Sequence, residues 1–376
     1  MLIGVPLETA AGETRVSVTA ETAKKLKAQG HTVRVQSGAG VAASVTDEAY
    51  AAAGAEVVDR AGAFGCEMVL KVRGPDADEL SLMKPGTVLV GMLNPFDKDG
   101  LGRLATAGLT SFALEAAPRT TRAQSMDVLS SQANIGGYKA VMIAANQYQR
   151  LFPMLMTAAG TIKAARVVIL GVGVAGLQAI ATAKRLGAVI EASDVRPSVK
   201  EQVESLGAKF IDVPYETAEE KEAAEGVGGY ARPMPQSWLD RQKVEVAKRV
   251  AQADVVISTA LIPGRAAPVL ITEEMVKAMK PGSVIVDMAA GKGPSGTDGN
   301  CPLTEAGKTV VRHGVTIVGE TNLPALAAAD ASALYARNVL DFLKLVVTKE
   351  GTFQIPADDD IVAACLMTQD GQVKRS

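Results

Sequence analysis

Residues 167–188 have the sequence VVILGVGVAGLQAIATAKRLGA, in which an aliphatic run, a glycine-rich turn and a helical pattern follow one another. Gly171 suits a tight turn, Gly173 lets a pyrophosphate approach the backbone, and Gly176 lets the helix pack closely on the strand. The unpaired N–H groups at the start of such a helix attract phosphates. The stretch therefore predicts a strand–turn–helix unit that binds a dinucleotide, although a tight turn without a ligand would use the same glycines.

An acidic residue follows this unit at the expected distance. Asp194 lies 18 residues after Gly176, at the end of the next apolar run. Its carboxylate is suited to accept hydrogen bonds from the adenosine ribose diol and to repel a 2′-phosphate, which favours NAD(H) over NADP(H). Arg196, two residues further on, could instead serve a 2′-phosphate.

Residues 165–319 alternate similar apolar runs with helical patterns, as expected for parallel strands covered by helices on both faces. The predicted strands are Val167–Leu170, Val189–Ala192, Phe210–Val213, Val255–Thr259, Val284–Asp287 and Thr316–Val318. Because ligands bind beyond the carboxyl ends of parallel strands, the loops 259–264 and 288–290 are expected near a bound dinucleotide.

The first 115 residues show the same alternation without a glycine fingerprint. Predicted strands there are Leu2–Val5, Thr32–Val35, Glu56–Val58, Met68–Val72, Thr87–Val90 and Leu109–Phe112. The pattern predicts an α/β protein with two Rossmann-like domains, which have parallel sheets and are joined by long helices. We expect a discontinuous N-terminal domain (1–132 plus 326–376), a dinucleotide-binding domain (146–320) and connecting helices over 133–152 and 330–348.

The composition of the chain argues against several classes of function. A length of 376 residues suggests two domains, and a formal net charge of −2 gives no electrostatic reason to expect binding to nucleic acid or anionic membranes. Three scattered cysteines predict neither a disulfide framework nor a metal site, which favours a reducing, cytoplasmic compartment. No apolar run reaches the ~18 to 20 residues that span a bilayer, so no membrane insertion is expected.

Two segments depart from the regular alternation. Residues 214–235 are rich first in glutamate and then in glycine, which predicts either a mobile loop over the site or a solvated insertion. Residues 118–132 (PRTTRAQSMDVLSSQ) are polar and are expected at the interdomain cleft. Their side chains could orient a carboxamide or merely cap the following helix.

Few groups are available for proton transfer. The only histidines, His31 and His313, are expected to have structural or surface roles. Lys71 and Arg73 end a predicted strand and could bind a carboxylate or lie on the surface. Hydride transfer between two carbon centres needs positioning and exclusion of water but no proton donor.

Several stretches of the chain are similar to a known family. The chain resembles the NAD(H)-binding component (domain I, alpha-1) of proton-translocating transhydrogenases, within the alanine dehydrogenase/transhydrogenase family. The stretches that carry this resemblance are residues 119–132, 171–188, 199–210, 229–231, 259–264, 270–276 and 280–289. The resemblance covers essentially the whole chain. Alanine dehydrogenases place a histidine after the strand 88–90, where this chain has Gly91-Met92-Leu93-Asn94-Pro95. Relative to the family, residues 291–298 are an insertion.

The resemblance implies roles for particular residues. Arg119, Gln124, Asp127 and Ser130 would act in catalysis by holding the nicotinamide ring, and Gly229 and Tyr230 would belong to a loop that closes over NAD(H). The cofactor-binding residues implied in this way, together with those of the glycine turn, are Arg119, Thr120, Thr121, Arg122, Gln124, Ser125, Met126, Asp127, Gly171, Gly173, Val174, Ala175, Gly176, Asp194, Val195, Arg196, Gly229, Tyr230, Gln242, Ala260 and Leu261. No metal site is implied.

The resemblance also implies partners and an activity. The chain would bind NAD(H) as a homodimer and exchange hydride with NADP(H) on a beta subunit, coupled to proton movement through a membrane-spanning subunit. It would then be attached peripherally to the cytoplasmic side of the inner membrane. Two alternatives stay open: an NAD-dependent alanine dehydrogenase that uses Lys71 as acid–base group, and a non-catalytic NAD sensor.

Overall fold

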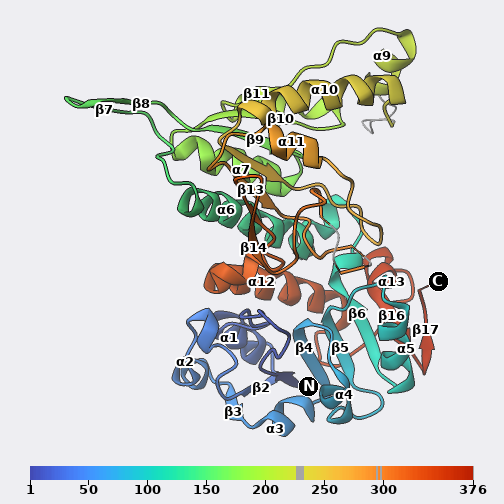
Figure 1. Ribbon diagram of the computed structural model, residues 1–376. Helices are drawn as coiled ribbons and strands as arrows, with labels where there is room; N and C mark the ends of the chain where they lie inside the picture. Colours follow the sequence, from blue (N-terminus) through green and yellow to red (C-terminus); the bar gives the residue numbers. More distant parts are fainter. Residues whose placement is uncertain (226–232, 294, 297–298, 376) are drawn as a thin grey trace. The chain divides into compact units, whose positions relative to one another are not determined.

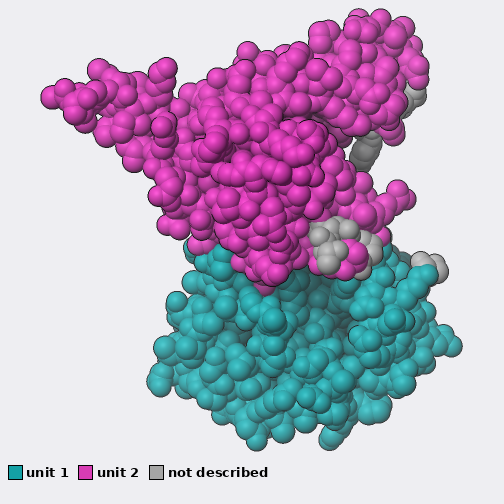
Figure 2. All heavy atoms as spheres, viewed as in Figure 1, with its two compact units in different colours: residues 1–132, 324–376 teal, residues 133–323 magenta. Residues whose placement is uncertain are grey.

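The computed structural model describes residues 1–225, 233–293, 295–296 and 299–375 of the chain (Figure 1). These residues form two compact units, coloured separately in Figure 2. Unit 1 comprises Met1–Gln132 and Pro324–Ser376, and unit 2 comprises Ala133–Leu323. Unit 1 is therefore discontinuous in sequence.

Unit 1 contains an eight-stranded sheet in the order β17-β16-β6-β5-β4-β1-β2-β3. Strands β1 to β6 are parallel, and their order 3-2-1-4-5-6 is that of a Rossmann-like fold. The C-terminal strands β16 and β17 extend the sheet in antiparallel fashion. The strands are β1 (Leu2–Val5), β2 (Thr32–Gln36), β3 (Glu56–Val58), β4 (Met68–Arg73), β5 (Val88–Met92), β6 (Thr110–Ala113), β16 (Leu366–Gln369) and β17 (Gln372–Val373).

Both faces of this sheet are buried, as the continuous apolar runs predict. Along β4, Met68 and Leu70 pack in the core that includes α12, whereas Val69 packs in a second core that includes α5. The helices are α1 (Ala20–Ala28), α2 (Asp47–Ala52), α3 (Arg60–Phe64), α4 (Ala77–Ser81), α5 (Lys98–Thr106), α12 (Ala328–Val346) and α13 (Asp360–Cys365), with short 3₁₀ turns η1 (Val41–Ala43), η2 (Leu114–Ala116), η3 (Thr121–Met126) and η5 (Leu323–Ala327).

Unit 2 contains a seven-stranded sheet in the order β11-β10-β9-β12-β13-β15-β14, parallel except for the edge strand β14. The order reverses between β9 and β12, which makes their carboxyl ends the switch point where ligands bind in such folds. The strands are β9 (Arg166–Leu170), β10 (Val189–Ser193), β11 (Lys209–Phe210), β12 (Val255–Ser258), β13 (Val284–Asp287), β14 (Thr309–Arg312) and β15 (Val315–Val318).

Helices cover both faces of the unit 2 sheet as well. Val167 and Ile169 pack in the core with α6, α7 and α8, whereas Val168 and Leu170 pack in the core with α10 and α11. These helices are α6 (Val128–Gln147, whose first five residues belong to unit 1), α7 (Val174–Arg185), α8 (Lys200–Ser205, preceded by η4, Pro197–Val199), α10 (Gln236–Gln252) and α11 (Glu273–Ala278). A further helix, α9 (Ala218–Glu225), packs in a separate small cluster with Val213 and Trp238.

Several predicted elements differ from the observed ones. The connecting helix predicted over 133–152 is α6, which begins at Val128 and ends at Gln147, and the one predicted over 330–348 is α12. On α6 the buried positions include Ala140 and Val141, whereas Tyr138 is exposed. The strand predicted over 210–213 is only the two-residue β11.

The charge-rich part of 214–235 is not a loop throughout. Residues Ala218–Glu225 form α9, in which Glu220 and Ala223 are buried. The structure therefore has a helix with a buried face in this part, where a loop or a solvated insertion was expected. A glutamate buried through hydrogen bonds leaves no apolar signature in the sequence.

A two-stranded hairpin was also missed. Strands β7 (Leu155–Thr157) and β8 (Gly160–Ile162) are antiparallel, and all six of their residues are exposed. The hairpin extends away from the remainder of unit 2 (Figure 1). Met154 and Met156 beside and within it expose 61% and 71% of their surface, so its apolar side chains have no covering within the chain that the structure describes.

Crossing a bilayer as a helix requires about 20 predominantly apolar residues. None of the described helices, in either unit, combines the necessary length with sufficient apolar character.

Candidate dinucleotide site

The glycine turn between β9 and α7 has the geometry that its sequence predicts. Gly171 adopts φ +93°, a left-handed conformation that side chains disfavour. A Cβ on Gly176 would lie 2.0 Å from the carbonyl oxygen of Gly171, so only glycine permits this approach of helix and turn. By contrast, a Cβ on Gly173 would meet no atom within 4 Å. Space for a ligand therefore remains at Gly173, the residue that precedes α7.

The carboxylate of Asp194, just beyond β10, is bound to the same turn. Its Oδ2 accepts a hydrogen bond from the N–H of Val172 at 2.7 Å and one from Arg196 Nη2 at 3.0 Å. Its Oδ1 accepts bonds from the N–H and the Nε of Arg196, both at 2.9 Å. Burial opposes ionisation, but the Arg196 guanidinium and the two backbone N–H groups lower the pKa of Asp194 below its ordinary value. The carboxylate expected to receive a ribose diol is thus occupied by Arg196.

Gln242 on α10 fixes the backbone at this position. Its amide nitrogen donates to the carbonyl of Asp194 at 2.8 Å and to Ser193 Oγ at 3.2 Å, and the side chain is buried. Gln242 therefore joins α10 to the end of β10 from inside the protein, whereas Val195 is half exposed at the rim.

The loops after β12 and β13 are held by buried polar groups. Asn300 accepts from the N–H of Ala260 at 3.2 Å and donates to its carbonyl at 2.9 Å. The buried Asp287 accepts from the N–H of Ala289 at 3.0 Å and from Thr304 Oγ1 at 2.7 Å. Leu261, the next residue after Ala260, is exposed at 42%. The loop expected near a dinucleotide is thus fixed at its base and apolar at its tip.

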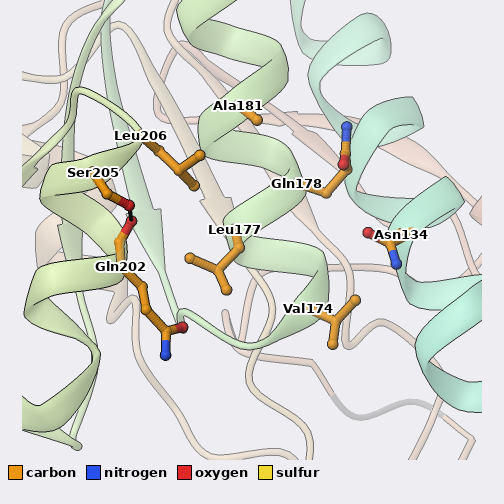
Figure 3. Close-up of a pocket in the computed structure, with 8 residues that line it drawn as sticks. All are labelled: Asn134, Val174, Leu177, Gln178, Ala181, Gln202, Ser205 and Leu206. Carbon is orange, nitrogen blue, oxygen red and sulfur yellow. Dashed lines mark hydrogen bonds between the residues drawn. The ribbon is translucent and has the colours of Figure 1, made fainter. Parts of the chain in front are cut away.

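A cavity of about 380 Å³ lies between α6, α7 and α8 (Figure 3). Its lining shares only Val174 with the glycine turn and contains amide, hydroxyl and aliphatic side chains but no charged group. The lining residues are Asn134, Val174, Leu177, Gln178, Ala181, Gln202, Ser205 and Leu206. Because a pyrophosphate needs donors and positive potential, this cavity does not replace the glycine turn as the phosphate site.

The polar segment 119–132 lies in unit 1, mostly on η3 and the start of α6. The side chains of Arg119, Thr120, Thr121, Gln124 and Ser125 are exposed, whereas Met126 is buried in the core of unit 1. Asn338 on α12 donates to the carbonyl of Ser125 at 2.7 Å, which fixes the backbone of the segment. The segment therefore has exposed polar side chains on a backbone that is anchored to the core of unit 1.

Two of the predicted ring-binding residues contact each other. Asp127 accepts a hydrogen bond from the N–H of Ser130 at 2.9 Å and from its hydroxyl at 2.5 Å. This is the contact that caps a helix N-terminus, here that of α6. Helix capping, one of the two alternatives for this segment, is thus present for Asp127, and both side chains remain half-buried.

Arg122 does not extend freely into solvent. Its guanidinium forms hydrogen bonds of 2.7 and 2.9 Å with the two oxygens of Asp359 and also pairs with Asp360. These contacts join η3 to the start of α13, so Arg122 forms a structural link between these two elements.

The cations that the sequence left open to a substrate carboxylate are paired within unit 1. Lys71 Nζ lies 3.2 Å from Glu8 and 3.1 Å from Glu79, and all three side chains are at most 2% exposed. Arg73 Nε lies 3.0 Å from Glu13, which also binds the buried Arg15 at 2.6 Å. Despite its burial, hydrogen bonds from Arg15 lower the pKa of Glu13 to about 2. Lys71 therefore does not face solvent, contrary to the surface alternative.

Gly229 and Tyr230, predicted to close over NAD(H), lie outside the described residues. Of the segment that flanks them, α9 is fixed by Glu220, whose carboxylate accepts from the N–H of Glu216 at 2.7 Å and from Arg241 Nη2 at 2.7 Å. Trp238, the only tryptophan of the chain, packs beside α9 and donates to the carbonyl of Val213 at 3.2 Å.

This anchor gives a pH prediction. The N–H of Glu216, together with Arg241, lowers the pKa of Glu220 to about 2, from an ordinary value of 4.5. A carboxyl group whose pKa is depressed by folding stabilises the fold above its unfolded pKa and loses that effect as the pH falls towards the folded pKa. Trp238 fluorescence should therefore be constant from pH 8 to 5 and should change between about pH 4.5 and 2.

Glu220→Gln is the matched variant, because it keeps the shape of the side chain and removes its titration. It should remove the part of the fluorescence change that precedes global unfolding, which circular dichroism follows. The same transition in the variant would contradict the assignment to Glu220.

Sequence reasoning missed residues that act through the backbone. A Cβ on Gly137 of α6 would lie 2.2 Å from the carbonyl oxygen of Ala175, so α6 packs directly against the start of α7. Asn300 holds the loop at Ala260, and Asn338 holds the loop at Ser125. The adjacent glycines 136 and 137 within a helical pattern were a signal for close packing, whereas the two asparagines gave none.

The chain is similar to known proteins over its whole length. It matches the alanine dehydrogenase/PNT family, with the N-terminal domain over residues 4–136 and the C-terminal domain over 140–376. It is 49% identical to the first part of the NAD(P) transhydrogenase alpha subunit of Rhodospirillum rubrum, over 99% of this chain and 97% of that protein. It is 30% identical to alanine dehydrogenase of Bacillus subtilis, over 99% and 92%.

A solved structure agrees with these relatives. The crystal structure of a transhydrogenase from Sinorhizobium meliloti matches with a TM-score of 0.89 and 45% identity, over 99% of this chain and 100% of that one. The predicted class, two Rossmann-like domains with parallel sheets, is thereby confirmed. The chain belongs to the alanine dehydrogenase/PNT family and, within it, to the NAD(P) transhydrogenase alpha subunits.

Proposed function

We propose that this chain binds NAD(H) and exchanges hydride directly with NADP(H) held by a partner beta subunit of a transhydrogenase. Hydride transfer would be coupled to proton movement through a membrane-spanning subunit by changes in nucleotide affinity. The chain itself supplies binding, orientation and exclusion of water, because direct hydride transfer requires no proton donor on the protein.

The observation that carries this proposal is the open space at Gly173 beside the crowded Gly171 and Gly176. A merely structural turn needs the two crowded glycines, whereas Gly173 makes no close contact that a side chain would disturb. A ligand that touches the backbone explains the third glycine, and the start of α7 favours an anionic one.

We assign residue roles on this basis. Gly171, Gly173, Val174, Ala175 and Gly176 would hold the pyrophosphate, while Asp194, Val195, Arg196 and Gln242 would form the adenosine-ribose region. Ala260 and Leu261 would cover the dinucleotide. Arg119, Gln124, Asp127 and Ser130 would hold the nicotinamide, and residues 146–320 would constitute the dinucleotide-binding domain.

We further propose that the chain acts as a homodimer attached to the cytoplasmic side of the inner membrane through its partner subunits. The exposed apolar hairpin β7–β8 supports a protein contact, since side chains such as Met156 lose unfavourable hydration when a second subunit covers them.

The dehydrogenase alternative is disfavoured by the charges of unit 1. An acid–base lysine must exchange protons with a substrate, and a carboxylate substrate needs an available cation. Lys71 is buried between Glu8 and Glu79, and Arg15 is bound to Glu13 and to Gln132 at 2.7 Å.

One reconstitution separates the three candidate functions. The purified chain is mixed with the NADP(H)-binding component of a transhydrogenase. Hydride transfer from NADH to an NADP⁺ analogue is followed by absorbance, with an analogue whose reduced form absorbs at a wavelength different from that of NADH. Transfer above the rate of either protein alone supports the proposal. NADH binding without transfer favours a sensor, and oxidative deamination of alanine with NAD⁺ by the chain alone would identify a dehydrogenase.

Gln124→Asn tests the assignment of the exposed amide on η3. The shortened side chain should slow hydride transfer about tenfold or more while changing the NADH dissociation constant less than threefold, as for a group that acts in transfer. Stopped-flow transfer and calorimetric binding give the two values. Gln29→Asn, at an exposed glutamine after α1, should change neither. Equal losses in binding and rate would contradict a position beside the reacting rings.

A further inference from the structure

The carboxylate of Asp194 has no acceptor position left for a ligand in the described state. An ionised carboxylate offers about four lone-pair positions. The N–H of Val172 fills one of them, and Arg196 fills the other three, through its backbone N–H, its Nε and its Nη2, at 2.7 to 3.0 Å. A ribose diol that donates to Asp194 must therefore displace a donor.

Only the guanidinium of Arg196 can be displaced at low cost. One of the two backbone N–H donors, that of Val172, belongs to the glycine turn. The other, that of Arg196, is held in place because Gln242 binds the carbonyl of Asp194 from the buried side. The guanidinium has one further partner, the carbonyl of Val172, at the longer distance of 3.3 Å. The side chain of Asp194 is 6% exposed, whereas that of Arg196 is 46% exposed and lies towards solvent. A partly exposed arginine can exchange its partner for water, while a buried carboxylate cannot remain without donors.

We propose that Arg196 is a self-competitor for the adenosine-ribose subsite: its guanidinium occupies the Asp194 carboxylate in the nucleotide-free protein, and the ribose diol replaces it when NAD(H) binds. This inference rests on the proposed NAD(H) binding. It assigns Arg196 a role opposite to that of a simple ligand, because the Asp194–Arg196 pair subtracts from the affinity that the diol contributes. It also keeps the buried carboxylate paired whenever the nucleotide leaves.

The exchange predicts a specific change in ligand discrimination. The measured quantity is the ratio of dissociation constants for the 2′-deoxyadenosine analogue of NADH and for NADH itself. In the wild-type chain each hydroxyl contact replaces an arginine contact, so the ratio should be small. In Arg196→Met the hydroxyl gains its whole bond to an ionised group, and the ratio should be about tenfold larger.

Using a ratio makes the test independent of other contacts. Any new contact of the displaced arginine with phosphate or adenine affects both ligands and cancels. Arg196→Lys, which offers one flexible donor group in place of the planar fork, should give an intermediate ratio. Arg185→Met controls for the loss of a positive charge, since Arg185 ends α7 about 16 Å along the helix from its start.

The exchange can also be observed directly. The ¹⁵N signal of Arg196 Nε should shift when saturating NADH is added, and should not shift with reduced nicotinamide mononucleotide, which lacks the adenosine ribose. An equal or smaller ratio in Arg196→Met, in a variant whose circular dichroism is unchanged, would overturn the inference, as would an Nε signal that NADH leaves in place. If none of the four proteins binds NADH, the proposed function itself fails.

Discussion

Replacement of Gly173 by alanine is expected to leave the fold unchanged and to weaken NADH binding by about two orders of magnitude, equivalent to ~2.7 kcal/mol. The backbone at Gly173 has φ −84° and ψ −164°, which alanine adopts readily, and the new Cβ meets no protein atom within 4 Å. The methyl group would instead stand where the pyrophosphate approaches the backbone. Calorimetric titration with NADH gives the affinity, and thermal unfolding without nucleotide gives the stability.

Gly176→Ala is the matched variant with the opposite expectation. Its Cβ would lie 2.0 Å from the backbone oxygen of Gly171, so the turn or α7 must move and the melting temperature should fall. Unaltered NADH affinity in a folded Gly173→Ala protein would remove the main support for a dinucleotide at this turn.

Lys71→Met should be the most destabilising single substitution that we predict, by about 3–5 kcal/mol in the free energy of unfolding. The change leaves Glu8 and Glu79 buried without their cation. Burial already raises the pKa of Glu8, in spite of Lys71. Without Lys71 the carboxyl should take up a proton more readily in the folded state, so the loss should diminish as the pH falls from 8 to 5. Urea unfolding at several pH values measures this.

Two further variants make that result specific. Glu8→Gln and Glu79→Gln added to Lys71→Met should recover much of the stability, because no buried charge remains uncompensated. Lys25→Met removes a lysine from an exposed pair with Glu21 and should cost less than about 0.5 kcal/mol. A small, pH-independent loss for Lys71→Met would mean that the buried cluster is not ionised as described.

The central strands could be predicted from sequence because they are continuous apolar runs that both sheet faces bury. Strand β13 was predicted to the residue, and β9 within one residue. The elements that were missed lack this signal. The hairpin β7–β8 is exposed throughout, and α9 buries Glu220 through hydrogen bonds to Arg241 and to the backbone, which no hydrophobic period reveals.

The geometry of the glycine turn could be predicted because each of these glycines has a single physical reason. Gly171 and Gly176 are required by backbone geometry, and the spacing of Asp194 follows from the length of α7 and β10. The hydrogen-bond partners of side chains could not be predicted, because they depend on residues that are distant in sequence. No local sequence pattern indicates that Arg196 binds Asp194 or that Arg122 binds Asp359. The same holds for the hydrogen bond from the backbone of Ala260 to Asn300.

The discontinuity of unit 1 has a consequence for synthesis on the ribosome. Strands β1 to β6 leave the ribosome first, but one face of their sheet is completed by Tyr335 and Phe342 of α12, and its edge by β16. All of unit 2 is translated before these residues emerge. The nascent N-terminal sheet therefore keeps an uncovered apolar face while about 190 residues are added, which takes roughly 10 to 40 s at ordinary elongation rates. During that interval the growing polypeptide is a natural client for chaperones that shield such faces.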